Sequence, residues 1–189
     1  MKFNLENREQ IPIVETARTA LLHHGKFLLL EKSKDSKNPG ALEFPGGKID
    51  EIKNINSSMQ EQKDSAIRET QEETGINIEN LPIEKIESFE SFFETKKKDG
   101  TIQKSKRITH LFLVRLPDGE EFNLKVNEMK NEMGGSEDNH QGYRWVTPGE
   151  LVKYAVSFEE NEVTGKQFHP LSRNSRYIKK LLSSTGYIE

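Results

Sequence analysis

The sequence Arg68-Glu69-Thr70-Gln71-Glu72-Glu73-Thr74-Gly75-Ile76 combines three closely spaced glutamates with a final glycine. On a helix, Glu69, Glu72 and Glu73 lie at relative angles of about 0°, 300° and 40°, so their carboxylates fan over one face. Carboxylates crowded in this way repel one another unless a cation lies among them. Oxygen ligands of this kind suit Mg²⁺ or Mn²⁺, which also bridge phosphate oxygens. Arg68 precedes Glu72 by one turn and could orient it.

The ends of this helix can also be predicted. Ser57 or Ser58 should begin it, because Ser58 and Glu61 have the spacing of a capping box. Gly75 should end it, because glycine accepts the left-handed conformation of a C-cap. Apolar or small residues at positions 59, 66, 67, 70 and 74 form one stripe at helical spacing, about a quarter-turn from the glutamates.

A second informative string, Leu42-Glu43-Phe44-Pro45-Gly46-Gly47-Lys48, lies upstream and predicts a short strand broken by a rigid turn. Two consecutive glycines expose backbone carbonyls that could complete a metal shell. Glutamates spaced as in this helix usually mark only a solvated acidic face. The glycine cap and the upstream string together favour a functional site instead.

Together the two strings resemble the signature of the Nudix hydrolase family, and residues 42–48 resemble its MutT-like members, which are nucleoside triphosphate pyrophosphohydrolases. The signature is a glycine, five residues, a glutamate, seven residues, and then Arg-Glu-aliphatic-x-Glu-Glu-x-Gly-aliphatic. The resemblance implies an α/β fold, a Nudix-type α/β/α sandwich with a mixed sheet. It also implies one domain over residues 1–189, with the signature at about residues 46–76. The order of strands and helices along the chain independently indicates a mixed sheet flanked by helices.

The resemblance further implies roles for individual residues. Glu69, Glu72, Glu73 and the Gly46 carbonyl would bind Mg²⁺ or Mn²⁺. Arg68 would hold the glutamates and, with Glu69 and Glu72, form the catalytic group, while Glu69 or a later loop carboxylate helps to activate water. The implied chemistry is attack of water on phosphorus. Substrate contacts are expected from three further residues, Glu43, Lys48 and Asn174.

The chain departs from the signature in three ways. Arg68 is the twenty-first residue after Gly47, whereas the arginine of the family signature is the fourteenth residue after its glycine. Seven residues are therefore inserted here. The mid-signature glutamate falls on Lys53 or on Gln60, depending on the end from which one counts, which removes one supporting contact to the helix. Thr70 replaces an aliphatic residue. We expect residues 53–59 to form an exposed loop that can be removed, because long surface loops cost little closure entropy.

Elsewhere the pattern predicts a hairpin from residues 16–22 and 26–30 around a His24-Gly25 turn. Strands are expected at 86–93, 108–116 and 143–146, with a hairpin tip around Asp99-Gly100 and a second hairpin or loop at 117–138. Thr147 with Glu150 should cap a helix, and a last helix should cover about 174–183.

Several further residues have two interpretations. Glu137 and Asp138 could supply one more carboxylate or could be loop acids without a ligand, and an exposed loop His140 could be a base. The lysines of the 96–107 hairpin could bind phosphate or RNA, although a solvated hairpin is favoured. Phe89 and Phe93 should share one strand face and Phe92 the other, so at least one of the three could line the pocket, although core packing is favoured. Trp145 is assigned to packing in preference to stacking on a base.

The composition excludes several classes. There is no cysteine, which rules out disulfides and thiolate zinc sites. A net charge of -3 is too small to attract nucleic acid or a membrane in bulk, and no apolar run is long enough to span a bilayer. The N-terminus lacks the apolar stretch of a signal peptide, so a cytoplasmic protein is expected. The sequence is compatible with a homodimer and does not decide it.

The function that these features favour is Mg²⁺-dependent hydrolysis of a pyrophosphate linkage in a nucleoside diphosphate derivative, such as a nucleoside triphosphate. The alternative is a Nudix-fold module that senses a nucleotide without cutting it. The three glutamates favour the enzyme, because a sensor needs no divalent cluster. Asn174 at the start of the last helix could recognise a purine edge or simply cap the helix.

Overall fold

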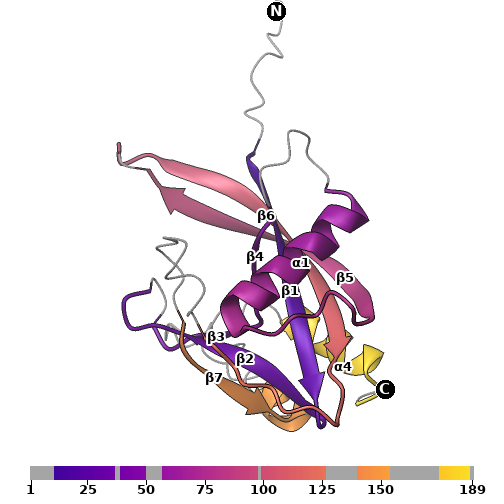
Figure 1. Ribbon diagram of the computed structural model, residues 1–189. Helices are drawn as coiled ribbons and strands as arrows, with labels where there is room; N and C mark the ends of the chain where they lie inside the picture. Colours follow the sequence, from indigo (N-terminus) through magenta and orange to yellow (C-terminus); the bar gives the residue numbers. More distant parts are fainter. Residues whose placement is uncertain are drawn as a thin grey trace, which may run out of the picture.

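The computed structural model describes residues 11–36, 39–49, 57–97, 99–126, 140–153 and 175–187. Within them, a seven-stranded sheet carries helices on its two faces (Figure 1). The elements are β1 (Ile13–His23), β2 (Lys26–Lys32), β3 (Leu42–Glu43), β4 (Gly46–Lys48), α1 (Met59–Thr74), β5 (Ile83–Lys96), β6 (Ile102–Arg115), β7 (His140–Val146) and α4 (Ser175–Ser184).

The sheet is mixed, as predicted. Its main path runs β3-β2-β1-β6-β5, with β4 paired to β1 and β7 paired to β2. The strands β1 and β6 are parallel over ten residue pairs, from Ile13 with Lys106 to Leu22 with Arg115, and the other pairings are antiparallel. The predicted α/β sandwich with a mixed sheet is therefore confirmed.

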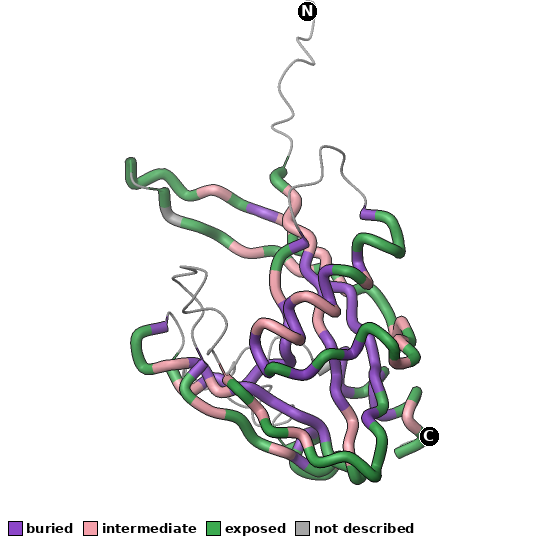
Figure 2. The backbone as a smooth tube through the Cα atoms, viewed as in Figure 1, coloured by how far each residue is buried: buried purple, intermediate pink, exposed green. Residues whose placement is uncertain are grey.

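Alternation along the central strands gives each face of the sheet its own core. On β1, Ala20 belongs to the hydrophobic cluster that contains the buried residues of α4. Leu21 belongs to a second cluster, which contains Ile76 and Ile78 from the segment between α1 and β5. On β6, Leu113 and Val114 divide in the same way. Four residues of the predicted last helix, α4, are buried: Tyr177, Ile178, Leu181 and Leu182. Figure 2 shows this burial concentrated in the sheet centre and on the inner sides of the helices.

Both predicted ends of α1 are confirmed. The Ser58 hydroxyl accepts a hydrogen bond from the Glu61 backbone N–H at 3.2 Å, and the Glu61 carboxylate accepts one from the Ser58 N–H at 2.6 Å. Gly75 closes the helix in the left-handed conformation with φ 76°. The cap residues therefore fix where the glutamate-bearing turns lie.

The buried face of α1 is unusually polar, and this explains Thr70. Thr70 is fully buried, and its hydroxyl donates to the Thr19 hydroxyl of β1 at 2.9 Å. Thr19 in turn reaches the Ala66 carbonyl at 3.5 Å. A threonine therefore replaces the aliphatic residue of the signature without leaving a buried hydroxyl unpaired.

The prediction that residues 53–59 form a removable loop was wrong for residues 57–59. Met59 is the first residue of α1, and Ser58 caps it. Ser57 is buried and donates to the Glu15 carboxylate through both its N–H, at 3.1 Å, and its hydroxyl. These three residues belong to the folded domain because they anchor the helix; residues 53–56 lie outside the described part.

The hairpin of β5 and β6 extends beyond the body of the domain (Figures 1 and 2). Phe89 packs on Tyr177 with ring centroids 4.0 Å apart, but Phe92 is 67% exposed, so core packing was wrong for Phe92. The basic residues are partly paired: Lys106 with Glu90 at 2.6 Å, and Arg107 over the Phe93 ring at 4.8 Å.

The other predicted elements are also found. His24 and Gly25 form the turn between β1 and β2, and the tip at Asp99-Gly100 lies between β5 and β6. Trp145 packs as a partly buried residue of the sheet. Thr147 and Glu150 make the expected reciprocal cap of a helix over residues 148–153. Of the expected loop at 117–138, residues 117–126 contain no strand, and residues 127–138 lie outside the described part.

Candidate active site

The carboxylate-bearing end of α1 faces the short strand β4. The side chains of Glu69 and Glu73 are buried, with 9% and 2% exposed, whereas that of Glu72 is 19% exposed. Glu69 and Glu73 are four residues apart and lie on the buried face of α1, which also includes Ala66 and Thr70. The helix therefore holds two of the three predicted ligands against the sheet and leaves the third nearer to solvent.

The two glycines of the turn are explained by close approaches. Gly46 has φ 147°, and a Cβ there would lie 2.2 Å from the Ala17 carbonyl oxygen. A Cβ on Gly47 would lie 2.4 Å from the Glu69 carboxylate. Because real Cβ atoms do not approach so closely, only glycine at position 47 lets the carboxylate of Glu69 rest against the backbone.

Different groups hold the three glutamates. The Gly46 N–H donates to Glu73 Oε2 at 2.8 Å. The Arg68 guanidinium lies 3.0 Å from Glu69 Oε1 and 3.4 Å from Glu72 Oε2, and it also donates to the Lys48 carbonyl at 3.3 Å. The arginine thus links two of the carboxylates to β4, and its orienting role stays a prediction.

The glutamates do not converge on one point in this structure. One oxygen from each of the three carboxylates cannot be chosen so that all three lie within 4.8 Å of one another. Among the described residues, His23, His24 and Asp118 do form such a group, with one ligand atom from each. Contacts through Arg68 and the Gly46 N–H nevertheless place Glu69, Glu72 and Glu73 in one region beside β4. Their roles as ligands and as catalytic residues stay predictions.

Behind the turn lies a buried ionic network centred on Glu43. Its carboxylate lies 3.1 Å from Arg18 of β1, 3.3 Å from Lys32 of β2 and 3.0 Å from His140 Nε2 of β7. Burial alone raises the pKa of the Glu43 carboxyl, but Arg18, the hydrogen bond from His140 and Lys32 outweigh it and lower the pKa to about 2. Glu43 is therefore ionised at neutral pH.

The network reaches α1 through His140. Its Nδ1 lies 3.9 Å from Glu73 Oε1, and its side chain is fully buried. Arg18 also donates to the Phe44 carbonyl at 2.7 Å and so ties the turn to β1. His140 therefore lies near one carboxylate oxygen of Glu73, while the other accepts the hydrogen bond from the Gly46 N–H.

Sequence reasoning misplaced His140. It was expected in an exposed loop, but it begins β7 and is 3% exposed. Its partner Glu43 is 97 residues away, so no local pattern could have revealed the contact. Of the predicted substrate contacts, Glu43 is engaged by three cationic or donor groups and Lys48 is exposed. Asn174, Glu137 and Asp138 lie outside the described residues.

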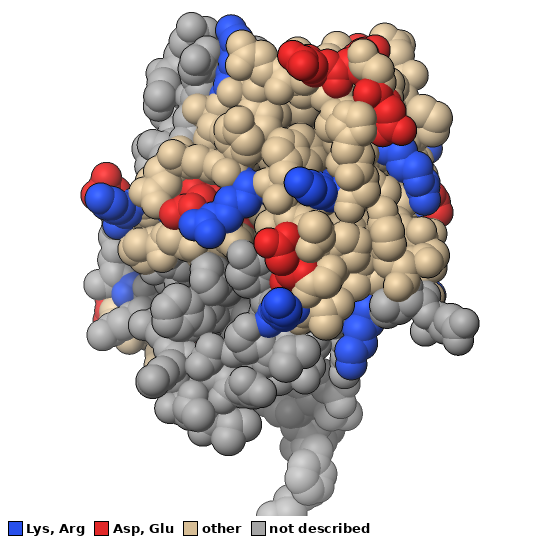
Figure 3. All heavy atoms as spheres, turned by 90° about the horizontal axis from the view of Figure 1, so that it is seen from below, with Lys and Arg blue, Asp and Glu red and all other residues tan. Residues whose placement is uncertain are grey.

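Charge elsewhere on the surface is mixed. Figure 3 shows one face on which the described lysines, arginines and acidic residues are interspersed. This distribution agrees with the small net charge of -3. Among the described residues, no helix is both long and apolar enough to cross a bilayer.

Comparison with known proteins identifies the family. The family model described as the NUDIX domain matches residues 15–167, so the chain belongs to this family. No curated protein matches the sequence. The predicted resemblance is therefore confirmed, as is the prediction of an enzyme that hydrolyses pyrophosphate bonds.

Solved structures agree in fold. The MutT protein from Methanosarcina mazei Go1 is 19% identical with a TM-score of 0.56, over 93% of this chain and 97% of that one. The E. coli dihydroneopterin triphosphate pyrophosphohydrolase is 13% identical with a TM-score of 0.56, over 90% and 95%. A C. elegans Ap4A hydrolase is 18% identical with a TM-score of 0.54, over 93% and 99%. At these identities the likeness shows the shared fold.

Proposed function

We propose that this chain hydrolyses a pyrophosphate linkage in a nucleoside diphosphate derivative, with a nucleoside triphosphate or a related nucleotide as substrate and Mg²⁺ or Mn²⁺ as cofactor. One observation carries the proposal: Glu69, Glu72 and Glu73 are gathered with Arg68 beside the Gly46-Gly47 turn. Proteins of similar fold include a dihydroneopterin triphosphate pyrophosphohydrolase and an Ap4A hydrolase, which supports a nucleotide-like pyrophosphate substrate.

The donor set fits a hard divalent cation. Glu69 and Glu73 are buried carboxylates with oxygen donors only, and the Glu69 carboxylate fills the space that a Cβ on residue 47 would take. The residues that would hold the cation are Glu69, Glu72 and Glu73, with the Gly46 carbonyl as a further donor. A bound divalent cation lowers the pKa of a water molecule and neutralises charge on the phosphoryl oxygens.

The chain's own residues supply position and charge. Arg68 holds Glu69 and Glu72 in position relative to Lys48 of β4. The Gly46 N–H and the nearby His140 restrict Glu73. Glu69, whose carboxylate lies against the Gly47 backbone, is the group that we assign to accept a proton from the attacking water.

The test is hydrolysis of a panel of nucleoside triphosphates, dinucleoside polyphosphates and sugar nucleotides, with products identified by mass. Wild type should cleave at least one of them with Mg²⁺ and none in excess chelator. Glu73→Gln should lower the rate by about 10²-fold or more, because a charged ligand is lost. Glutamine retains an oxygen for the Gly46 N–H, so the fold should survive.

Glu79→Gln is the matched control, because Glu79 is exposed beyond the end of α1. It should leave the rate unchanged. Tight binding of a nucleotide by wild type without any product, with or without Mg²⁺, would refute the proposal and favour the sensing module. Full activity of Glu73→Gln would refute the assignment of the ligands.

A further inference from the structure

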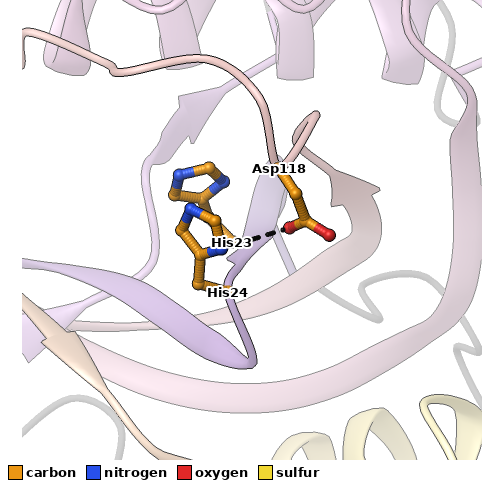
Figure 4. A group of neighbouring side chains, drawn as sticks. All are labelled: His23, His24 and Asp118. Atoms are coloured by element: carbon orange, nitrogen blue, oxygen red, sulfur yellow. Dashed lines mark ion pairs between the residues drawn. The ribbon is translucent and has the colours of Figure 1, made fainter.

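A second group of metal-type ligands lies at the far end of the sheet from the glutamates. His23 ends β1, His24 begins the turn to β2, and Asp118 follows β6 (Figure 4). One ligand atom from each of the three residues lies within 4.8 Å of the other two. Arg18 is the last β1 residue paired with β4, and His23 is five residues further along, or about 16 Å at strand spacing. The group is therefore separate from the candidate active site.

The fold brings these residues together for identifiable reasons. The parallel pairing of β1 with β6 ends at Leu22 and Arg115, and the Leu116 N–H donates to the Leu22 carbonyl at 2.9 Å. This hydrogen bond carries the chain after β6 past His23 and delivers Asp118 beside it. On the other side, a two-residue turn of His24 and Gly25, with φ of 46° and 70°, folds His24 back over the sheet end.

The position of the His23 ring is fixed by packing. Its centroid lies 5.3 Å from that of Phe122 at an interplanar angle of 89°, and 5.7 Å from that of Trp145. The His24 ring lies 4.0 Å from it. A ring held in this way loses little freedom when its nitrogen binds a ligand, so part of the cost of ordering a site has already been met by the fold.

Distances and donor types indicate what would bind. His24 Nδ1 lies 3.5 Å from Asp118 Oδ1. Two ligands about 2.0–2.1 Å from a tetrahedral zinc ion are separated by roughly 3.4 Å. His23 Nδ1 is buried and has no hydrogen-bond partner among the described residues, which is the kind of group that calls for an ion or a water. Two imidazoles and one carboxylate suit zinc and similar transition metals rather than Mg²⁺.

We propose that His23, His24 and Asp118 bind a transition-metal ion of the zinc type. Three protein ligands leave a fourth position for water, and the exposure of the His24 and Asp118 side chains, 60% and 81%, gives the ion access from solvent. The ion would tie the β1–β2 turn to the segment after β6, so its effect is on stability. The Mg²⁺ chemistry at the glutamates does not depend on it.

The experiment is a Zn²⁺ titration of the full chain by calorimetry, with Mg²⁺ in large excess to occupy the glutamate site. Wild type should bind one equivalent of Zn²⁺, and its melting temperature should rise with Zn²⁺. His24→Asn keeps a residue that tolerates positive φ, so the turn should survive. His24→Asn and Asp118→Asn should each weaken Zn²⁺ binding at least about tenfold, since altering even a group that only supports a metal ligand costs that much.

Glu120→Gln is the matched control, because Glu120 is an exposed carboxylate in the same segment that lies outside the group. It should bind Zn²⁺ as wild type does. Mg²⁺-dependent hydrolysis should be the same in wild type, His24→Asn and Asp118→Asn. Equal Zn²⁺ affinity in wild type and both site variants would overturn the proposal, as would a single Zn²⁺ equivalent that excess Mg²⁺ displaces.

Discussion

Replacing Glu43 by glutamine should remove the largest single electrostatic contribution that the structure allows us to assign. The side chain keeps its shape but loses the charge that faces Arg18, Lys32 and His140. The carboxyl pKa falls from 4.5 to about 2 on folding, which corresponds to about 3 kcal/mol at ~1.36 kcal/mol per pKa unit. Removing one partner of a buried ion pair typically costs about 3–5 kcal/mol. The free energy obtained from the pKa shift agrees with this range.

The pH dependence follows from the direction of the shift. Because the folded pKa lies below the unfolded one, the contribution of Glu43 is complete above about pH 4.5 and is lost as the pH falls towards about 2. Urea unfolding of wild type and Glu43→Gln at several pH values measures it. The difference in free energy of unfolding should be about 3 kcal/mol at pH 7 and should shrink steadily below pH 4.5.

A matched surface pair provides the control for this experiment. Glu84 lies 3.1 Å from Arg115, but both side chains are about half exposed. Glu84→Gln should therefore cost no more than about 1 kcal/mol at any pH. The reasoning about the Glu43 network would be refuted if Glu43→Gln and Glu84→Gln had the same small effect, or if the effect of Glu43→Gln did not change between pH 5 and pH 3.

Three other predictions concern the candidate site and its helix. Gly47→Ala should lower the rate of hydrolysis by about 10²-fold, because the added Cβ displaces the Glu69 carboxylate. Gly149→Ala is the control and should leave the rate unchanged, because a Cβ there meets no other atom. Ser58→Ala should lower the free energy of unfolding by about 1 kcal/mol through loss of the helix cap, and an unchanged urea midpoint would argue against that role. Thr70→Val should cost about 1–3 kcal/mol by leaving Thr19 without its donor, and adding Thr19→Val should restore part of the loss; a single variant as stable as wild type would contradict the pairing.

The site could be predicted where its information is local. The spacing of Glu69, Glu72 and Glu73 sets their angular positions on a helix, because helical geometry depends only on residue number. Ser58 and Gly75 set the ends of that helix because capping is a short-range hydrogen-bonding event. The sequence also marked the turn at Gly46-Gly47, since glycine pairs are strong signals of unusual backbone. Each of these features depends on residues that are neighbours along the chain.

What only the tertiary structure decided depends on contacts across the sheet. His140 lies beside Glu43 and Glu73 because β7 pairs with β2, and β2 pairs with β3. Phe92 is exposed because no described element covers this part of the β5–β6 hairpin, so alternation alone could not distinguish core from solvent. Ser57 is folded because Glu15, on β1, reaches it.

The same division holds for the His23, His24 and Asp118 group. The two histidines are adjacent in the chain, but the carboxylate beside them comes from the far end of β6 through the parallel pairing with β1. The sequence by itself thus determined the helix, its caps, its glutamates and the family that they indicate. Strand pairing decided which distant side chains were buried together, because its register is set by the packing of the whole sheet and not by any local pattern.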